Sequence, residues 1–360
     1  MPSRISPSLL TRLDPQRMFD SIGHLPDQVE AAWSAISTTP FPASYRRVRH
    51  VVVAGMGGSA IGTHLIQSVF RDRLSVPITI VSDYTVPSWV NRETLLLLSS
   101  YSGGTEEILA VAESAQRAGI PMIALTTGGA LSAFARAHRL PAVVFGTEHN
   151  PCGQPRIGLG YAVTYQLGVF RQVGLIDLTD QEMRRIIRCL RAANAGYSQL
   201  AGPNPALELA HQARLRMPII VASEHLAGNA HIFANQWNEN AKNFAAWFVI
   251  PELNHHLLEG LTAPAAVRKR LLVLMIESGL YDPRNRKRYG ITTQVLRRQG
   301  IACQAVLARG ETPLEQAFDL LLLGSYASFY QAVANRVNPT PIPWVDEFKR
   351  LMGRAVTSDQ

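Results

Sequence analysis

The chain has 360 residues, of which 47% are hydrophobic and 17% are charged, and its formal net charge is +8. This length predicts two or three domains with sizeable cores, and no run reaches the roughly 18 apolar residues of a membrane helix, which argues against a membrane protein. The three cysteines are far apart and form no CxxC pair, so neither a disulfide framework nor a zinc site is expected. The first twenty residues lack the apolar core of a secretory signal, and we expect a cytoplasmic protein.

The basic residues are scattered along the chain, apart from a run at 284–288. Short charge runs are usually solvated, so we interpret this run as a surface loop. Because aromatic residues flank the run and do not interleave with it, nucleic-acid binding is only a weak alternative.

In chain order, residues 1–44 predict a helical segment with polar helices at 14–37. A first domain at 45–180 follows, in which short apolar runs alternate with amphipathic stretches, as is typical of βαβ units. We expect its strands at 51–54, 77–82, 94–99, 121–126 and 142–145 and its helices at 59–70, 105–118, 131–137 and 159–173.

A connecting region at 181–204 carries most of a polar helix and then a Gly-Pro linker signal. The alternation restarts in a second domain at 205–335, and a turn and a last helix occupy 336–360. We expect strands at 218–223, 246–250, 271–276 and 301–307 and helices at 180–195, 229–243, 289–299, 314–336 and 345–352. The predicted fold class is α/β, with two doubly wound domains, each a mostly parallel sheet flanked by helices.

A glycine-rich turn follows the first predicted strand and opens a helix. Backbone N–H groups and the helix dipole favour an anion there, with Gly57, Gly58 and Ser59 closest to it. The pattern also fits a dinucleotide fingerprint, with Asp83 as the ribose partner, and it fits a turn that only packs. The turn alone leaves the three interpretations open.

A hydroxyl-rich loop at 99–107 follows the third predicted strand. Its hydroxyls and amides can surround a phosphate without a metal, and it lacks the lysine of a P-loop. Ordinary capping explains the same residues, with Thr105 as N-cap and Glu106 and Glu107 in the first helical turn. Both interpretations can hold together.

Three further segments, at 154–156, 235–242 and 251–256, supply a guanidinium, a carboxylate and an imidazole. Aldose–ketose isomerisation needs this set. A base moves a proton between C2 and C1, an acid–base group opens the ring, and a positive charge stabilises the enediolate.

Plainer interpretations exist for the same segments. Glu239 and Lys242 could form a surface ion pair on one helix, and His255 could be an ordinary loop histidine. A metal site at His255, His256 and Glu252 is disfavoured, because adjacent histidines point in different directions.

Five ordered motifs resemble the bifunctional phosphoglucose/phosphomannose isomerases of the sugar isomerase (SIS) domain family. They are G-M-G-G-S at 55–59, S-Y-S-G-G-T at 100–105, P-R at 155–156, N-E-N-A-K at 238–242 and P-E-L-N-H at 251–255. The resemblance spans about 51–349, nearly the whole chain.

The resemblance implies a role for each matching residue. Glu239 is the expected base and Arg156 the expected partner of the enediolate. His255, given by the partner subunit of a homodimer, opens the ring with help from Lys349. The implied phosphate contacts are Ser59, Ser100, Ser102 and Thr105.

Two residues depart from the family pattern. Gly104 and His256 stand where the family usually has Asn, which leaves the preference for one sugar phosphate open.

We therefore expect an isomerase that needs no cofactor and no metal, with its site between the domains. Its substrates would be glucose 6-phosphate and mannose 6-phosphate, interconverted with fructose 6-phosphate. Two alternatives stay open: a non-catalytic SIS protein that binds a phosphosugar and regulates a partner, and a nicotinamide-dependent oxidoreductase that uses the glycine-rich turn.

Overall fold

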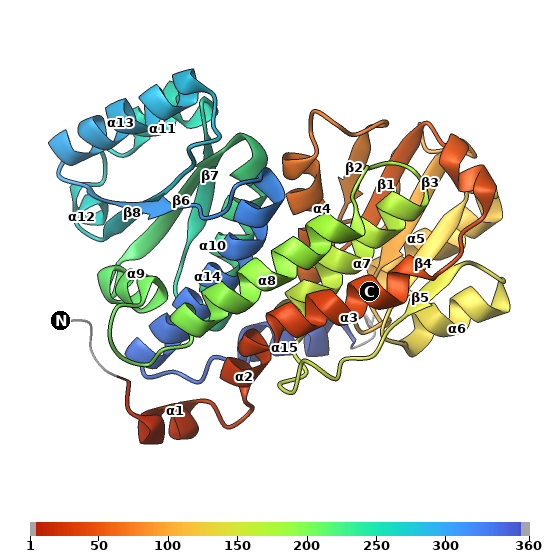
Figure 1. Ribbon diagram of the computed structural model, residues 1–360, viewed down its shortest axis with the longest axis horizontal. Helices are drawn as coiled ribbons and strands as arrows, with labels where there is room; N and C mark the ends of the chain where they lie inside the picture. Colours follow the sequence, from red (N-terminus) through yellow and green to blue (C-terminus); the bar gives the residue numbers. More distant parts are fainter. Residues whose placement is uncertain (1–4, 354–360) are drawn as a thin grey trace, which may run out of the picture.

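The computed structural model describes residues 5–353 and contains two parallel sheets, one in each half of the chain (Figure 1). The strand order is β2-β1-β3-β4-β5 in the first sheet and β7-β6-β8-β9 in the second. The predicted α/β fold class is confirmed. The strands are β1 (His50–Gly55), β2 (Ile78–Val81), β3 (Thr94–Ser99), β4 (Met122–Thr126), β5 (Ala142–Val144), β6 (Met217–Ser223), β7 (Ala246–Ile250), β8 (Leu271–Glu277) and β9 (Ala302–Leu307).

Helices cover both faces of the first sheet, which explains its apolar strands. Val52 and Ala54 of β1 share a core with α5 and α6, whereas Val51 and Val53 share one with α4 and α7. A strand buried on both faces has no polar side to present, so β3 is apolar without alternation. The helices of this half are α1 (Pro7–Leu13), α2 (Met18–Gly23), α3 (Leu25–Ser37), η1 (Ala43–Arg47), α4 (Gly58–Val69), α5 (Glu106–Ala118), α6 (Gly129–Ala137), η2 (Pro155–Ile157) and α7 (Leu159–Gln172).

The second half repeats the plan with a different set of helices. α10 packs on β6 and on α14, α14 packs on α9, and α13 contacts β8 and β9. None of the described helices combines the length and apolar character needed to cross a bilayer. The helices are α8 (Asp180–Tyr197), α9 (Pro205–Ala213), η3 (Glu224–Leu226), α10 (Ala227–Asn240), η4 (Glu252–His255), α11 (Leu257–Gly260), α12 (Ala265–Arg268), α13 (Pro283–Arg298), α14 (Pro313–Ala334) and α15 (Pro343–Met352).

The two halves are joined by packing as well as by the chain. α4 contacts α10 between the sheets, and α8 contacts both α3 and α14 (Figure 1). One hydrophobic core extends from β1 to α14. The domain boundaries at 45–180 and 205–335 therefore remain predictions, since no break in the core marks them.

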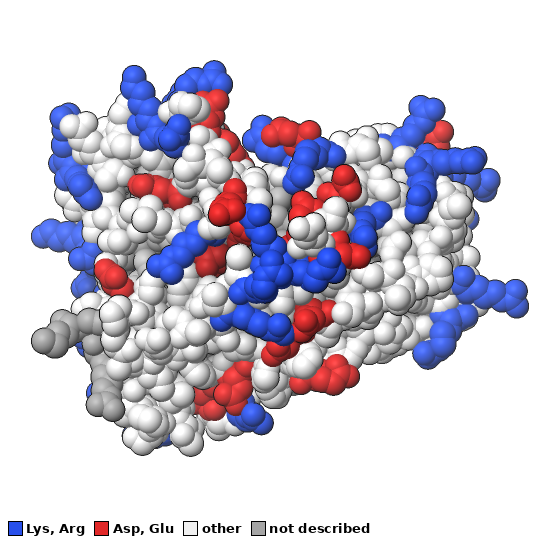
Figure 2. All heavy atoms as spheres, in the orientation of Figure 1, with Lys and Arg blue, Asp and Glu red and all other residues white. Residues whose placement is uncertain are grey.

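We expected the basic run at 284–288 to be a surface loop, and this expectation is wrong. The run lies at the start of α13. Pro283 occupies the first helical turn, and the Asp282 side chain accepts a hydrogen bond from the Arg284 N–H at 2.8 Å. These cap signals were present in the sequence and were outweighed by the charge of the run. Most of the run is exposed, and on the face shown in Figure 2 basic and acidic side chains are interspersed.

Other helices also differ from expectation. α1, α9, α11 and α12 were not predicted, because each is short. α9 begins at Pro205, inside the linker signal. α10 ends at Asn240, because Lys242 adopts a left-handed backbone with φ 52°.

Candidate active site

The glycine-rich turn and the hydroxyl-rich loop meet at the carboxyl ends of the neighbouring strands β1 and β3. The Ser59 hydroxyl accepts a hydrogen bond from the Tyr101 N–H at 3.1 Å. The Ser59 carbonyl accepts from the Ser99 hydroxyl at 3.0 Å and from the Gln166 amide at 2.8 Å. These contacts hold the two loops against each other at the edge where parallel sheets usually bind ligands.

The loop at 100–105 is organised by its own hydroxyl groups. The Ser100 and Thr105 hydroxyls lie 2.7 Å apart, and Ser100 accepts from the Gly103 N–H at 3.1 Å. Ser102 accepts from the Gly104 N–H at 3.3 Å. Thr105 is the N-cap residue of α5, and Glu106 and Glu107 lie in the first turn, as the capping interpretation predicted. The Thr105 side chain makes no cap hydrogen bond to α5, so that part of the interpretation is wrong.

Two helix N-termini therefore face this edge of the sheet without side-chain caps. α4 begins after Gly57 and α5 after Thr105, and neither N-cap residue has a side-chain hydrogen bond to its helix. Their first N–H groups and their positive dipole ends favour an anion. The described geometry fits a phosphate group held by neutral donors.

Arg156 connects the two halves of the site. Its side chain is buried, and its Nε donates to Asn240 Oδ1 at 3.0 Å, next to Glu239 in the chain. A Cβ atom added to Gly58 would lie 3.5 Å from the Arg156 Cα, so the glycine-rich turn packs directly on this residue. Burial lowers the pKa of Arg156, while the charge of Glu239 opposes that shift.

The guanidinium of Arg156 is also fixed from its other side. Nη1 donates to Gln154 Oε1 at 2.7 Å, and Nη2 donates to the Pro339 and Thr340 carbonyls at 3.1 and 2.6 Å. These contacts leave few of its five N–H groups free. Arg156 is thus held in place by the protein, and its main contribution to the site is a fixed positive charge.

Glu239 lies at the end of α10 and is surrounded by positive charge. Burial raises its pKa, and the charges of Arg156, Lys242 and Lys349 lower it in turn. Lys349 belongs to the exposed helix α15 and thus reaches the site electrostatically. A carboxylate in such a place can remain ionised and still be a stronger base than in water.

Lys242 was not among the predicted site residues, although the N-E-N-A-K motif contained it. Its Nζ donates to the Glu239 carbonyl and, at 2.9 Å, to the Pro339 carbonyl. Burial lowers the pKa of Lys242 to about 8. The ion-pair interpretation is wrong, since no ion pair of the described chain joins Glu239 to Lys242.

His255 is not gathered into this group. It is an exposed residue of η4, after the carboxyl end of β7, and the charges that act on Glu239 do not include it among the described residues. The adjacent His256 bonds through Nε2 to Glu252 Oε2 at 2.9 Å. Of the four predicted catalytic residues, Arg156 and Lys349 thus act on Glu239 within one chain, and His255 does not.

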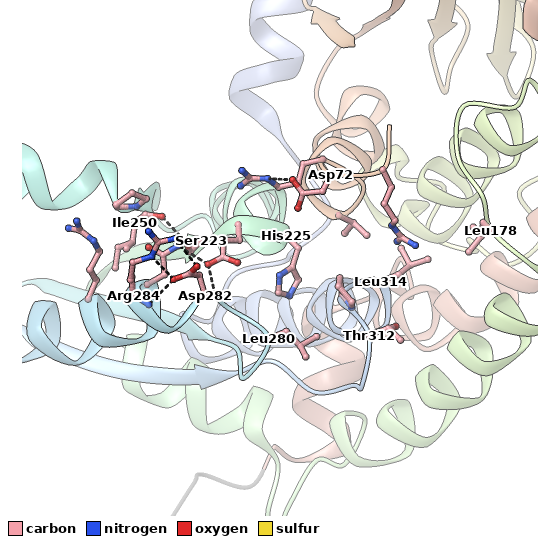
Figure 3. Close-up of a pocket in the computed structure, with 18 of the residues that line it drawn as sticks. Asp72, Leu178, Ser223, His225, Ile250, Leu280, Asp282, Arg284, Thr312 and Leu314 are labelled. Atoms are coloured by element: carbon pink, nitrogen blue, oxygen red, sulfur yellow. Dashed lines mark hydrogen bonds and ion pairs between the residues drawn. The ribbon is translucent and has the colours of Figure 1, made fainter. Parts of the chain in front are cut away.

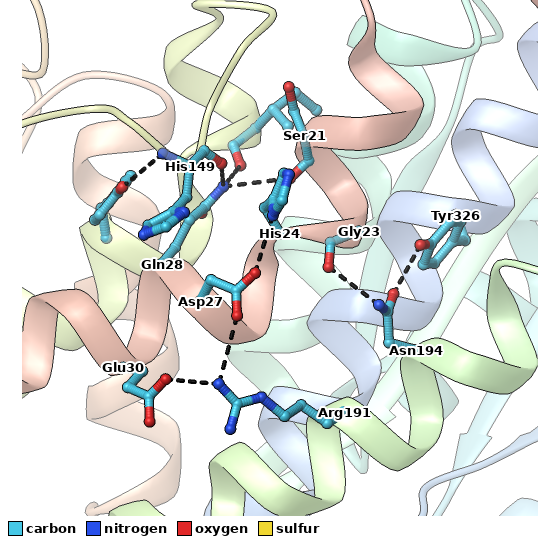
Figure 4. A network of polar contacts seen from close by, with 12 residues as sticks. Ser21, Gly23, His24, Asp27, Gln28, Glu30, His149, Arg191, Asn194 and Tyr326 are labelled. Carbon is cyan, nitrogen blue, oxygen red and sulfur yellow. Dashed lines mark hydrogen bonds and ion pairs between the residues drawn. The ribbon is translucent and has the colours of Figure 1, made fainter.

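A different group could hold a metal ion. The ligand atoms of His24, Asp27 and His149 lie within 4.8 Å of one another (Figure 4). His24 Nδ1 already bonds to Asp27 at 2.9 Å, and Arg191 approaches the same carboxylate at 3.5 Å. An ion would have to displace one contact and tolerate the guanidinium, so the present contacts suit a polar network better.

Comparison with known proteins agrees with the geometry. Over 342 residues the chain is 30% identical to a bifunctional phosphoglucose/phosphomannose isomerase from Caldicellulosiruptor bescii, and the match covers 93% of this chain and 98% of that one. This chain belongs to the bifunctional phosphoglucose/phosphomannose isomerase family. The membership that the five ordered motifs predicted is therefore confirmed.

Two further comparisons concern the second half of the chain and the overall fold. Residues 203–352 match the bacterial phospho-glucose isomerase C-terminal SIS domain. The fold is similar to that of a hypothetical protein from Thermus thermophilus, with a TM-score of 0.72 and 18% identity over 96% of this chain and 92% of that one. It is also similar to tagatose-6-phosphate ketose/aldose isomerase from Escherichia coli, with a TM-score of 0.70 and 17% identity over 95% and 98% of the two chains.

Proposed function

We propose that this enzyme interconverts glucose 6-phosphate and mannose 6-phosphate with fructose 6-phosphate through an enediolate. The observation that carries the proposal is the bond between Arg156 and Asn240, which brings the phosphate-binding edge of the first sheet to the carboxylate at the end of α10. A phosphosugar held by the loops would extend its carbonyl end toward Glu239.

The phosphate group is assigned to the two uncapped helix N-termini and the hydroxyls between them. The assigned contacts are the amides of Gly57 and Gly58 and the side chains of Ser59, Ser100, Ser102 and Thr105. Neutral donors suit this task, because their N–H and O–H groups can donate several hydrogen bonds to the oxygens of a dianion. No metal enters the proposal.

Glu239 is assigned the proton transfer. Its carboxylate takes the proton from C2 of the open-chain aldose and returns it to C1, while a second proton moves between the oxygen atoms. The pKa of Glu239 is raised, and this supports the role, since the pKa of an effective general base lies near the working pH. Arg156 offsets the negative charge that develops on the enediolate oxygen.

Ring opening is assigned to His255 of a partner subunit, assisted by Lys349. The exposure of His255 supports this assignment, because an exposed imidazole can enter a neighbouring site. A homodimer with shared active sites follows from the assignment. The cytoplasmic location also remains a prediction.

Glu239→Gln tests the assignment of the base. We expect kcat to fall by roughly 10²–10⁴-fold, with KM for fructose 6-phosphate nearly unchanged, because the amide keeps the shape and loses the basicity. A coupled assay with both aldose phosphates measures the effect. Glu113→Gln, an exposed carboxylate in the middle of α5, is the control.

Three outcomes would contradict the proposal. Wild-type turnover by Glu239→Gln would remove the base. Binding of hexose 6-phosphates by the wild type without turnover would favour a regulatory phosphosugar-binding protein. Saturable binding of a nicotinamide nucleotide in place of hexose 6-phosphate would favour the oxidoreductase, for which Asp83 lies exposed after β2.

A further inference from the structure

The two halves of the chain share one topology. β6, β7, β8 and β9 occupy in the second sheet the places of β1, β2, β3 and β4 in the first. The first strand of each half ends in a turn with a left-handed residue, Gly57 with φ 48° and Glu224 with φ 46°. Asp72 follows Gly57 at the same sequence distance at which Glu239 follows Glu224. The end of α4 therefore corresponds to the end of α10, where the proposed base lies.

A large cavity lies where this correspondence places a second site. Its volume is about 810 Å³, within the range of small-molecule sites. One wall comes from the carboxyl ends of β6 and β7 and the starts of α13 and α14, and the other from the end of α4 and the start of α8 (Figure 3). Its charged lining includes Asp72, Arg73, Glu182, Glu224, Asp282 and Arg288.

The anion positions used in the first half are filled by protein groups here. Asp282 caps α13 and pairs with Arg284 at 3.0 Å. Glu224 Oε1 accepts from the Asp282 N–H at 2.9 Å and from the Asn285 amide at 2.7 Å. A phosphate could not repeat the cradle of the first half, because two carboxylates already occupy it.

The acids of the lining are thus engaged, whereas two of its cations lack an ion pair. Arg73 Cζ lies 4.7 Å from the centroid of the Phe70 ring, and Arg288 Nη1 donates to Asn254 Oδ1 at 3.4 Å. Asp72 pairs with Arg71 at 3.4 Å, and Glu182 accepts from the Thr179 N–H at 2.7 Å. Arg73 and Arg288 form no ion pair within the described part of the chain. These cations come from opposite walls, one after α4 and the other in α13.

We propose that this cavity is a second ligand site and that it binds a phosphate-bearing metabolite through Arg73 and Arg288. Guanidinium groups suit phosphate, because their paired N–H donors match its oxygens. None of the side chains assigned to the isomerase site lines the cavity, and its occupancy does not depend on turnover. The buried His225, whose Nε2 bonds to Gln316 at 2.9 Å, forms part of its floor.

Calorimetric titration of the full chain with inorganic pyrophosphate at low salt tests the proposal. We expect a saturable component that weakens at least about tenfold in the double variant Arg73→Gln/Arg288→Gln, since two charge-assisted contacts are lost. The matched control removes two exposed arginines elsewhere, Arg117→Gln/Arg298→Gln, and should leave the component unchanged.

A second variant tests the cavity without removing either arginine. Leu280→Glu adds a carboxylate at a half-exposed lining position and should also weaken the component. The proposal is overturned if the wild type shows no saturable binding, if the double variant binds like the wild type, or if the control pair loses as much affinity. Because no turnover is measured, failure of the isomerase assignment would leave this result unaffected.

Discussion

Gly103 constrains the shape of the loop at 100–105, to which we assign the phosphate group. Its φ of +70° lies in the left-handed region, and an added Cβ would lie 1.9 Å from the Gly128 carbonyl oxygen. Both facts exclude any other residue without a shift of the backbone. At Gly104, by contrast, an added Cβ meets nothing within 4 Å.

Gly103→Ala should therefore destabilise the protein by about 2–4 kcal/mol and raise KM for hexose 6-phosphates. Urea unfolding and steady-state kinetics measure the two effects. Gly104→Ala, its neighbour, should change neither by much. Equal stability of the two variants would mean that the loop does not need the close approach of Gly103 to Gly128.

His64 and His231 form a contact between the halves of the chain at the scale of single side chains. The centroids of the two rings lie 4.5 Å apart. His64 belongs to α4 and His231 to α10. Burial lowers the pKa of His64 to about 4, with a further contribution from His231, and burial also lowers the pKa of His231. Both rings are thus neutral in the folded protein at pH 7.

This pair predicts a loss of stability on acidification. In the unfolded chain each histidine takes up a proton near pH 6.5, whereas in the folded protein His64 resists protonation until about pH 4 and the pKa of His231 is also lowered. Stability should fall between those values by on the order of 1–2 kcal/mol, allowing for partial exposure. Urea unfolding at pH 7 and pH 5 should show a smaller loss in His64→Gln/His231→Gln, and an identical loss would refute the assignment.

At the scale of elements, α9 shows how one side chain anchors a helix. The buried Asn204 accepts hydrogen bonds from the Ala206 and Leu207 N–H groups at 2.9 and 3.4 Å. Its amide donates to the Tyr197 and Gln199 carbonyls at 2.8 and 2.7 Å. The residue therefore starts α9 and fixes the end of α8 together.

Asn204→Ala should cost about 2 kcal/mol, because the cap is lost and the Tyr197 and Gln199 carbonyls each lose one donor. Ser6→Ala is the matched control. Ser6 caps the exposed start of α1 through one bond from the Leu9 N–H at 3.2 Å and should cost less than about 1 kcal/mol. Chemical unfolding of both variants compares the caps, and a cost at Asn204 no larger than at Ser6 would contradict the anchoring role.

At the scale of the whole molecule, α15 presents an apolar surface that is largely exposed. The side chains of Trp344, Phe348 and Leu351 are 85%, 62% and 51% exposed and lie on one helical face. The proposed function requires a second copy that brings His255 to the site. We expect the second copy to cover this face.

Trp344→Glu/Phe348→Glu should shift the protein from dimer to monomer, with a loss of kcat, because charges on the face oppose its burial. Light scattering after size-exclusion chromatography measures the mass. Leu307→Glu, at an exposed apolar position of β9, should leave the mass unchanged. A dimer that survives the double substitution would place the interface elsewhere.

The sequence by itself determined the α/β plan, the order of the strands along the chain and the two loops at the first sheet, because apolar runs, glycine turns and hydroxyl clusters are local signals. Its motifs also gave the family. The start of α13 was missed although its cap was visible, because the charge of the run outweighed the cap.

Only the tertiary structure decided which residues meet and how strongly their environment acts on them. Arg156 and Asn240 are 84 residues apart and bond in the core, and Lys242 reaches the carbonyl of Pro339. The raised pKa of Glu239 and the second cavity arise in the same way. Burial and long-range contacts come from packing one half on the other, and no local pattern in the sequence records that packing.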